Sequence, residues 1–166
     1  MSSDPNAVTD AVDRAADAFE YRGRGSVEFE PGIEQESQWQ TQLTKACRYL
    51  EACRSLRRVD GFDGAAVELC FGAVERTLEA YVLQDTDDDL ADFRDHEAVY
   101  DRATQRGLFE AETATALQDL YRANRTEHYY GGAVPTAEKA DAMYELAEAV
   151  HEYVTEQIRT GGVCIC

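Results

Sequence analysis

Apolar residues recur at three- and four-residue steps along most of the chain, which is the spacing of one face of an α-helix. The clearest stripe predicts a long helix over residues 37–57, and a second stripe predicts a helix over residues 63–83. The loop between them is short, which favours an antiparallel hairpin. The first stripe comprises Trp39, Leu43, Ala46, Leu50 and Cys53, and the second comprises Val67, Cys70, Phe71, Val74, Leu78 and Tyr81.

Weaker patterns predict the remaining helices. The pattern over residues 90–107 predicts one helix that ends at Gly107 in a left-handed cap. Another helix is predicted to start at Glu110. The acidic loop before residue 90 offers an aspartate as the cap of the helix that follows. Near the end of the chain, Thr136 is a good N-cap for a last helix that runs to about residue 158.

The N-terminal part has a different character from the rest. Residues 5–21 predict an Ala/Asp-rich helix, and the glycine-rich segment after it predicts an irregular connection. The expected fold class is therefore all-α: a bundle of four to five helices with an N-terminal helical arm. We expect the arm over residues 1–35, the bundle over residues 36–159, and a flexible tail over residues 160–166 that contains Cys164 and Cys166.

The charge is strongly negative and changes what can be expected of partners. The formal net charge is −17, and Lys45 and Lys139 are the only lysines. Abundant carboxylates with scarce lysine are typical of salt-adapted cytoplasms, where the Debye length falls to roughly 3 Å at 1 M salt. The N-terminus lacks a signal peptide and no long apolar run occurs, so we expect a cytoplasmic protein without a membrane partner.

The stretch Leu120–Gly132, LYRANRTEHYYGG, carries the strongest candidate chemistry. Metal-free RNA cleavage needs a proton-transfer group, which suits His128, and a fixed cation for the charged phosphorane, which suits Arg122. Six steps of an ideal helix turn by about 120°, so the two cannot share one face of a straight helix. Either the helix ends between them or a second chain completes the site. Asn124 is four residues from His128 and is expected to orient its ring, while Arg125 is expected to contact phosphate.

The Arg122–His128 spacing resembles the motif of the HEPN domains, small helical bundles of prokaryotic toxins, nucleotidyltransferase partners and RNA-processing proteins. Residues 36–159 carry the resemblance through the long hairpin, the segment Asp95-His96-Glu97, and Tyr130 two residues after His128. The chain departs from the commonest form because Ala123, not asparagine, follows Arg122. The resemblance implies an RNA-acting protein, with Arg122 and His128 catalytic and a homodimer that completes the cleft. It also implies RNA or nucleotide as ligand, and a cognate antitoxin or nucleotidyltransferase-like partner.

Other residues admit two interpretations. Arg54, Arg57 and Arg58 can point the same way as a phosphate-binding patch, or they can simply favour the C-terminus of their helix through its dipole. Glu148 and His151 have the spacing of di-iron bundles, but such sites need a second copy. The terminal Cys-Ile-Cys lacks a second thiol pair at metal-site spacing. We therefore predict no metal site and no cofactor.

Two functions of different classes remain open at this point. The first is a metal-independent endoribonuclease or toxin-like component that acts as a dimer. The second is a non-catalytic module in which Arg122 and Arg125 anchor nucleotide, RNA or a protein partner. Arg122 and Arg125 could also form surface ion pairs with Asp119, Glu127 or neighbouring acidic helices, a role with no chemistry.

Overall fold

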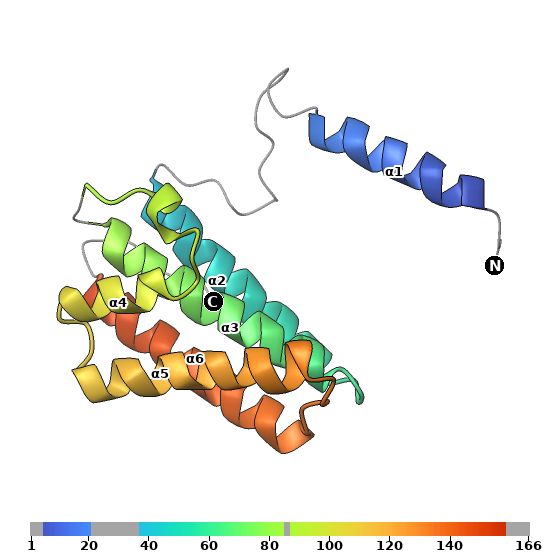
Figure 1. Cartoon of the computed structure of the whole chain (residues 1–166). Coiled ribbons are helices and arrows are strands. Elements are labelled where there is room, and N and C mark those ends of the chain that lie inside the picture. Colours follow the sequence, from blue (N-terminus) through green and yellow to red (C-terminus); the bar gives the residue numbers. More distant parts are fainter. Residues whose placement is uncertain (1–4, 21–36, 85–86, 159–166) are drawn as a thin grey trace. The chain divides into compact units, whose positions relative to one another are not determined.

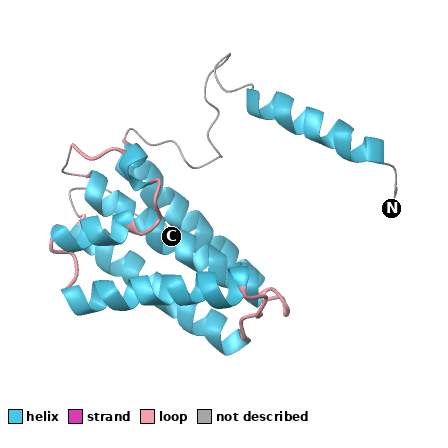
Figure 2. Ribbon diagram, viewed as in Figure 1, coloured by secondary structure: helices cyan, strands magenta, loops and turns pink. Residues whose placement is uncertain are grey.

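A computed structural model describes residues 5–20, 37–84 and 87–158. Within these ranges the secondary structure is helical, as Figure 2 shows, and the all-α fold class is confirmed. The chain divides into two units, Met1–Glu34 and Gln35–Cys166. The first unit contributes the helix α1 (Pro5–Glu20), whose Val8 and Val12 are exposed. The predicted irregular connection and the Cys-containing tail lie outside the described residues.

The second unit is a helical bundle built on a long hairpin (Figure 1). The hairpin consists of α2 (Gln38–Leu56) and α3 (Asp63–Leu83), within one residue of the predicted bounds. The other helices are α4 (Ala98–Gln105), α5 (Ala111–Asn124) and α6 (Ala137–Gln157). Two short elements complete the unit: the 3-10 turn η1 (Leu90–Phe93) and the π-helix η2 (Arg125–Tyr130), which continues directly from α5.

Helix α3 is the centre of the bundle. It packs chiefly against α2 and α6 and more lightly against α4. Its stripe of apolar residues is buried as predicted, apart from Tyr81 at the end of the stripe, and Leu78 is wholly inaccessible. Burial of a leucine-sized side chain contributes roughly 1.5–3 kcal/mol. Cys53 of α2 and Cys70 of α3 are buried free thiols with their Sγ atoms 3.2 Å apart, where the two helices touch.

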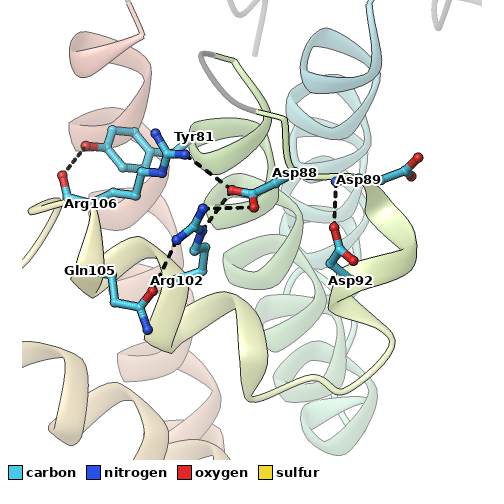
Figure 3. Close-up of polar contacts among 7 residues, drawn as sticks. All are labelled: Tyr81, Asp88, Asp89, Asp92, Arg102, Gln105 and Arg106. Atoms are coloured by element: carbon cyan, nitrogen blue, oxygen red, sulfur yellow. Dashed lines mark hydrogen bonds and ion pairs between the residues drawn. The ribbon is translucent and has the colours of Figure 1, made fainter.

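The single helix predicted over residues 90–107 is wrong. The structure has η1 and α4 instead, separated by a turn at residues 94–97. Asp89 caps η1 in a reciprocal capping box with Asp92 (Figure 3), so the chain begins a helix there as predicted but does not continue it. Gly107 does end α4 in the left-handed conformation, with a φ of 77°.

The acidic loop before η1 is tied to α4. Asp88 accepts hydrogen bonds from Arg102 Nε and Nη2 at 2.8 and 2.9 Å and lies 3.5 Å from Arg106 Nη2 (Figure 3). Tyr81 of α3 donates to the Arg106 carbonyl oxygen at 3.3 Å. These contacts hold α4 against the end of α3, and they thereby fix the position of the turn at residues 94–97.

Candidate active site

The turn at residues 94–97 presents His96 to a buried carboxylate of α3. The His96 Nδ1–H group donates to Glu75 Oε2 at 2.9 Å. Glu75 is only 5% exposed, whereas about half of the His96 side chain is accessible. A carboxylate on Nδ1 fixes the ring orientation and the tautomer, so that Nε2 is the nitrogen that exchanges protons with solvent or ligand. The pair has the arrangement of a positioned general base.

Arg125, the first residue of η2, and His96 both pack near the ring of Tyr121. Arg125 Nε donates to the Tyr121 hydroxyl oxygen at 3.1 Å, and Arg125 Cζ lies 5.2 Å from the centroid of the Tyr121 ring. The His96 ring centroid lies 6.0 Å from that ring. Burial raises the pKa of the Tyr121 hydroxyl, which therefore stays protonated and accepts from the guanidinium. Tyr121 therefore packs against both a histidine and an arginine.

These groups line a surface pocket of about 300 Å³, which we name the His96 pocket. Its wall combines residues of α2, α3, η2 and the turn before α4. The lining residues are Tyr49, Glu68, Leu69, Phe71, Gly72, Glu75, Arg76, His96 and Arg125. Two arginines and one histidine therefore converge with two glutamates, which makes the pocket far less acidic than the chain as a whole.

Arg76 is held in the wall of the His96 pocket by a buried carboxylate. Its Nη1 lies 2.7 Å from Glu79 Oε2, and Glu79 is 3% exposed. Burial raises the pKa of Glu79 to about 7, although the Arg76 charge opposes the rise. Near neutral pH the ionisation of Glu79 therefore changes the charge next to Arg76.

Arg122, predicted to be catalytic, lies at the surface in ion pairs. Its Nη2 is 2.5 Å from Glu97 Oε2, its Nε reaches both Glu97 oxygens at 3.1 Å, and its Nη1 is 3.4 Å from Asp119. The pairing with Asp119 is one of the ion pairs that the sequence offered as an alternative. Glu97 follows His96 in the chain, so Arg122 lies near the His96 pocket without lining it.

His128 lies elsewhere. Its Nδ1–H donates to the Ala133 carbonyl oxygen at 3.3 Å, and its Nε2 is 4.0 Å from Glu127 Oε2. Helix α5 does end between Arg122 and His128, as one of the two expected arrangements required, yet the two side chains contact different partners. No contact in the described part of the chain joins them.

The expected supporting residues are also separated. Asn124 is buried, and its amide donates to Glu68 Oε1 at 2.7 Å, so it is not seen to orient the His128 ring. Its Oδ1 atom is buried without a hydrogen-bond partner among the described residues. Asn124 and His128 do line one apolar pocket of about 250 Å³, together with residues of α3 and α6. Tyr130 is largely exposed.

The predicted phosphate-binding cluster on α2 is largely occupied by acidic residues of α6. Arg54 donates to the Tyr144 hydroxyl oxygen and to Glu148 at 3.0 and 3.2 Å. Arg57 donates twice to Asp141, at 2.9 and 2.6 Å. Arg58 is exposed at the end of the helix. Arg54 and Arg57 therefore join two helices through partly exposed ion pairs, a structural role that contributes little individually.

The Glu-x-x-His pair of α6 does not form a metal centre in the structure. His151 is buried, with Nδ1 2.9 Å from Thr77 Oγ1 and Nε2 3.5 Å from Cys47 Sγ, and burial lowers its pKa to about 4. Glu148 points instead to Arg54 and Tyr144. Over the described ranges, no three His, Cys, Asp or Glu side chains come together in a way that could hold a metal ion.

Sequence reasoning missed Glu75, Tyr49 and Tyr121 as site residues. One signal was present for Glu75: it lies four residues after Phe71 and three before Leu78, on the apolar stripe of its helix, where a carboxylate requires a partner. The sequence singled out His96 only as part of the segment Asp95-His96-Glu97 that carries the family resemblance. The helix break that exposes it has no clear signal in the sequence.

The fold and the pocket define a class: a small all-helical bundle with a polar surface pocket and an additional N-terminal helix. None of the described helices is both long and apolar enough to cross a membrane. The chain belongs to the family described as a domain of unknown function, DUF8154, whose model matches residues 3–166. No curated protein and no solved structure matches the chain.

Proposed function

We propose that this protein is a metal-independent endoribonuclease of HEPN type whose active site is the His96 pocket. The observation that carries the proposal is the Glu75–His96 hydrogen bond, with His96 and Arg125 packed against the same Tyr121 ring. This places the roles first assigned to His128 and Arg122 on His96 and Arg125. A homodimer and a cognate antitoxin or nucleotidyltransferase-like partner belong to the same proposal, because the resemblance brings them with it.

The chemistry needs only the groups in the pocket and solvent water. His96 Nε2 takes the proton of a ribose 2′-hydroxyl, whose oxygen attacks the adjacent phosphorus. The bond from phosphorus to the 5′-oxygen breaks, and this oxygen takes a proton from water, so the products are a 2′,3′-cyclic phosphate and a 5′-hydroxyl. The imidazolium of His96 then returns its proton to solvent. Glu75 stabilises the imidazolium that forms on His96, and Arg125 stabilises the extra negative charge on the phosphoryl oxygens.

Its place in the pocket wall favours Arg125 over Arg122 as the phosphate ligand. Arg122 does not line the pocket and is bound to Glu97 through two of its nitrogens, Nε and Nη2. A guanidinium already bound by a carboxylate fork has to lose that partner before it can bind phosphate with the same geometry. Arg122 would therefore have to release Glu97 before it could bind RNA.

Cleavage of RNA in the presence of EDTA tests the proposal. Wild-type protein in molar potassium chloride is incubated with total tRNA and with a single-stranded fluorogenic RNA, and the product ends are identified by mass spectrometry. His96→Gln retains a donor for Glu75, and His128→Gln is its matched control. We expect cyclic phosphate ends from the wild type and from His128→Gln, and a large loss in His96→Gln.

Two results separate the alternatives. Loss of cleavage in His128→Gln with full activity in His96→Gln would return the site to the stretch around residue 128. Intact RNA with every folded variant would overturn catalysis and favour the second candidate function, a non-catalytic module that binds nucleotide, RNA or a protein partner. The Glu68 and Glu75 carboxylates in the pocket wall weaken its attraction for phosphate, so within that alternative they favour a protein partner.

A further inference from the structure

The ring of Tyr49 lies directly on the backbone of α3 in the wall of the His96 pocket. A Cβ atom added at Gly72 would lie 2.9 Å from Tyr49 Cε2 and 3.0 Å from Cδ2, distances that real Cβ atoms essentially never show. Glycine in a helix interior costs about 1 kcal/mol relative to alanine. Gly72 therefore allows an approach of the Tyr49 ring that any other residue would prevent.

The accessible part of Tyr49 belongs to the pocket. Its neighbours on the helix face, Ala46, Leu50 and Cys53, are fully or almost fully buried, whereas Tyr49 is 36% exposed. Within the described ranges neither a hydrogen bond nor an aromatic contact of Tyr49 is present, and the residue lines the same pocket as His96 and Arg125. The Tyr49 ring packs against the backbone of α3 at Gly72 and has no aromatic partner among the described residues, so it is suited to a planar ligand.

We propose that Tyr49 is a base-stacking residue that makes the pocket selective for single-stranded RNA. The inference rests on the proposed function: the phosphate lies between His96 and Arg125, and the base of an adjoining nucleotide stacks on the Tyr49 ring. Aromatic rings bind bases this way because every base has a π-face, whereas a paired base is already stacked in its duplex. The pocket volume of about 300 Å³ is at the lower end of the range for ligand sites.

Binding of an uncleavable RNA tests the stacking directly. The probe is a 2′-O-methyl oligonucleotide that contains 2-aminopurine, whose fluorescence falls when the base stacks. Wild type and Tyr49→Phe are expected to bind alike and to quench the probe. Tyr49→Leu keeps much of the apolar volume without a π-face, and binding is expected to weaken about 5- to 100-fold. The same sequence in a duplex is expected to bind wild type as weakly as the single strand binds Tyr49→Leu.

Gly72→Ala gives a second, independent variant. Its Cβ displaces the end of a side chain, so the bundle still folds while the Tyr49 ring moves. We expect the same loss of quenching as in Tyr49→Leu, with an unchanged helical circular dichroism spectrum. In the cleavage assay both variants are expected to raise KM and to leave kcat within about threefold, because the reacting groups remain in place.

The outcomes distinguish the two proposals. One outcome would overturn the stacking role alone: wild type and Tyr49→Leu cleave RNA equally, bind the probe equally and leave its fluorescence unquenched. Failure of wild type to cleave, together with quenching that depends on Tyr49, retains the stacking role and overturns catalysis. His128→Gln is the control, since His128 does not line the His96 pocket, and this variant is expected to bind, quench the probe and cleave like wild type.

Discussion

Two arginine–histidine pairs lie in this bundle, and they differ in how they are brought together. Arg122 and His128 are six residues apart in the sequence, yet in the structure they contact different partners, Glu97 and Ala133. His96 and Arg125 are 29 residues apart, yet they pack on the same Tyr121 ring and line one pocket. Proximity along the chain does not bring Arg122 and His128 together, because a helix directs nearby side chains to different sides.

The two histidines also differ in their surroundings. His96 donates to a buried carboxylate, which can stabilise a charge on the ring. His128 donates to a backbone carbonyl, and the Glu127 carboxylate 4.0 Å from its Nε2 is exposed, so it is a weaker counter-charge than buried Glu75. A structural role suits the second arrangement, and acid–base chemistry suits the first.

The largest expected effect is the loss of cleavage in His96→Gln. General acid–base catalysis contributes about 10²- to 10⁴-fold, so kcat is expected to fall by that factor. His128→Gln is expected to stay within about threefold of wild type. The check is steady-state cleavage of the fluorogenic RNA, and equal rates for the two variants would remove the distinction between the histidines.

The two arginines are expected to differ by a smaller factor. Arg125→Gln removes one of the two arginines of the pocket, the one assigned to the phosphate, and is expected to lower kcat about 100-fold, as loss of a transition-state donor does. Arg122→Gln breaks only surface ion pairs and is expected to lower kcat less than about fivefold. Single-turnover rates at saturating protein measure the difference. A greater loss in Arg122→Gln would place the phosphate beside Glu97 instead.

The buried carboxylate of Glu79, which holds Arg76 in the wall of the His96 pocket, makes the stability of the protein depend on pH. The pKa of Glu79 is raised by burial to about 7, so the stability it contributes is full below about pH 4.5 and is lost as pH rises through 7. Glu79→Gln removes this dependence and is expected to be about 3 kcal/mol more stable than wild type at pH 8, with no difference near pH 4. Urea unfolding at the two pH values measures it, and an equal difference at both would contradict the assignment.

Buried His151 acts in the opposite direction and serves as an internal comparison. Its pKa is lowered by burial to about 4, so the stability it contributes is full above about pH 6.5 and is lost as pH falls through 4. His151→Gln is therefore expected to lose less stability than wild type between pH 6.5 and 4, by about 2 kcal/mol. Urea midpoints across this range that fall equally in both proteins would be inconsistent with a neutral buried ring.

The smallest expected effect concerns the N-cap of α6, close in sequence to the segment that holds His128. The Thr136 hydroxyl oxygen accepts a hydrogen bond from Lys139 N and caps α6, close in sequence to the Ala133 carbonyl that holds His128. Thr136→Ala is expected to cost about 1 kcal/mol of stability. Thermal unfolding gives the stability, and the cleavage rate of the folded variant is expected to match wild type. A lower cleavage rate in Thr136→Ala would indicate that the segment around His128 belongs to the active site.

The sequence predicted the framework of the bundle well. The bounds of α2 and α3, the cap at Thr136 and the left-handed Gly107 follow from local patterns, each of which depends on a few neighbouring residues. The turn at residues 94–97 was not predicted, because contacts distant in sequence, such as Asp88 with Arg102, compete with a continuous helix there.

The site was predicted only in part. Arg125 was expected to contact phosphate, and it does line the proposed pocket. Glu75 and Tyr49 were missed because their proposed roles depend on contacts between helices. Glu75 has no distinctive sequence context, and its hydrogen bond to His96 comes from a different element. The Tyr49 ring lines the pocket because it packs against Gly72 of the neighbouring helix. Such pairings arise from the packing of helices and leave little trace in local periodicity.

The most direct test of the central claim is a titration of the three histidine rings by nuclear magnetic resonance. Protein labelled at histidine is titrated with adenosine 3′-monophosphate, and each ring is assigned by its glutamine variant. The account predicts a saturable shift of the His96 ring signals, with His128 and His151 unchanged. A saturable shift of His128 without one of His96, or no shift of any ring at saturating nucleotide, would contradict the assignment of the functional site to the His96 pocket.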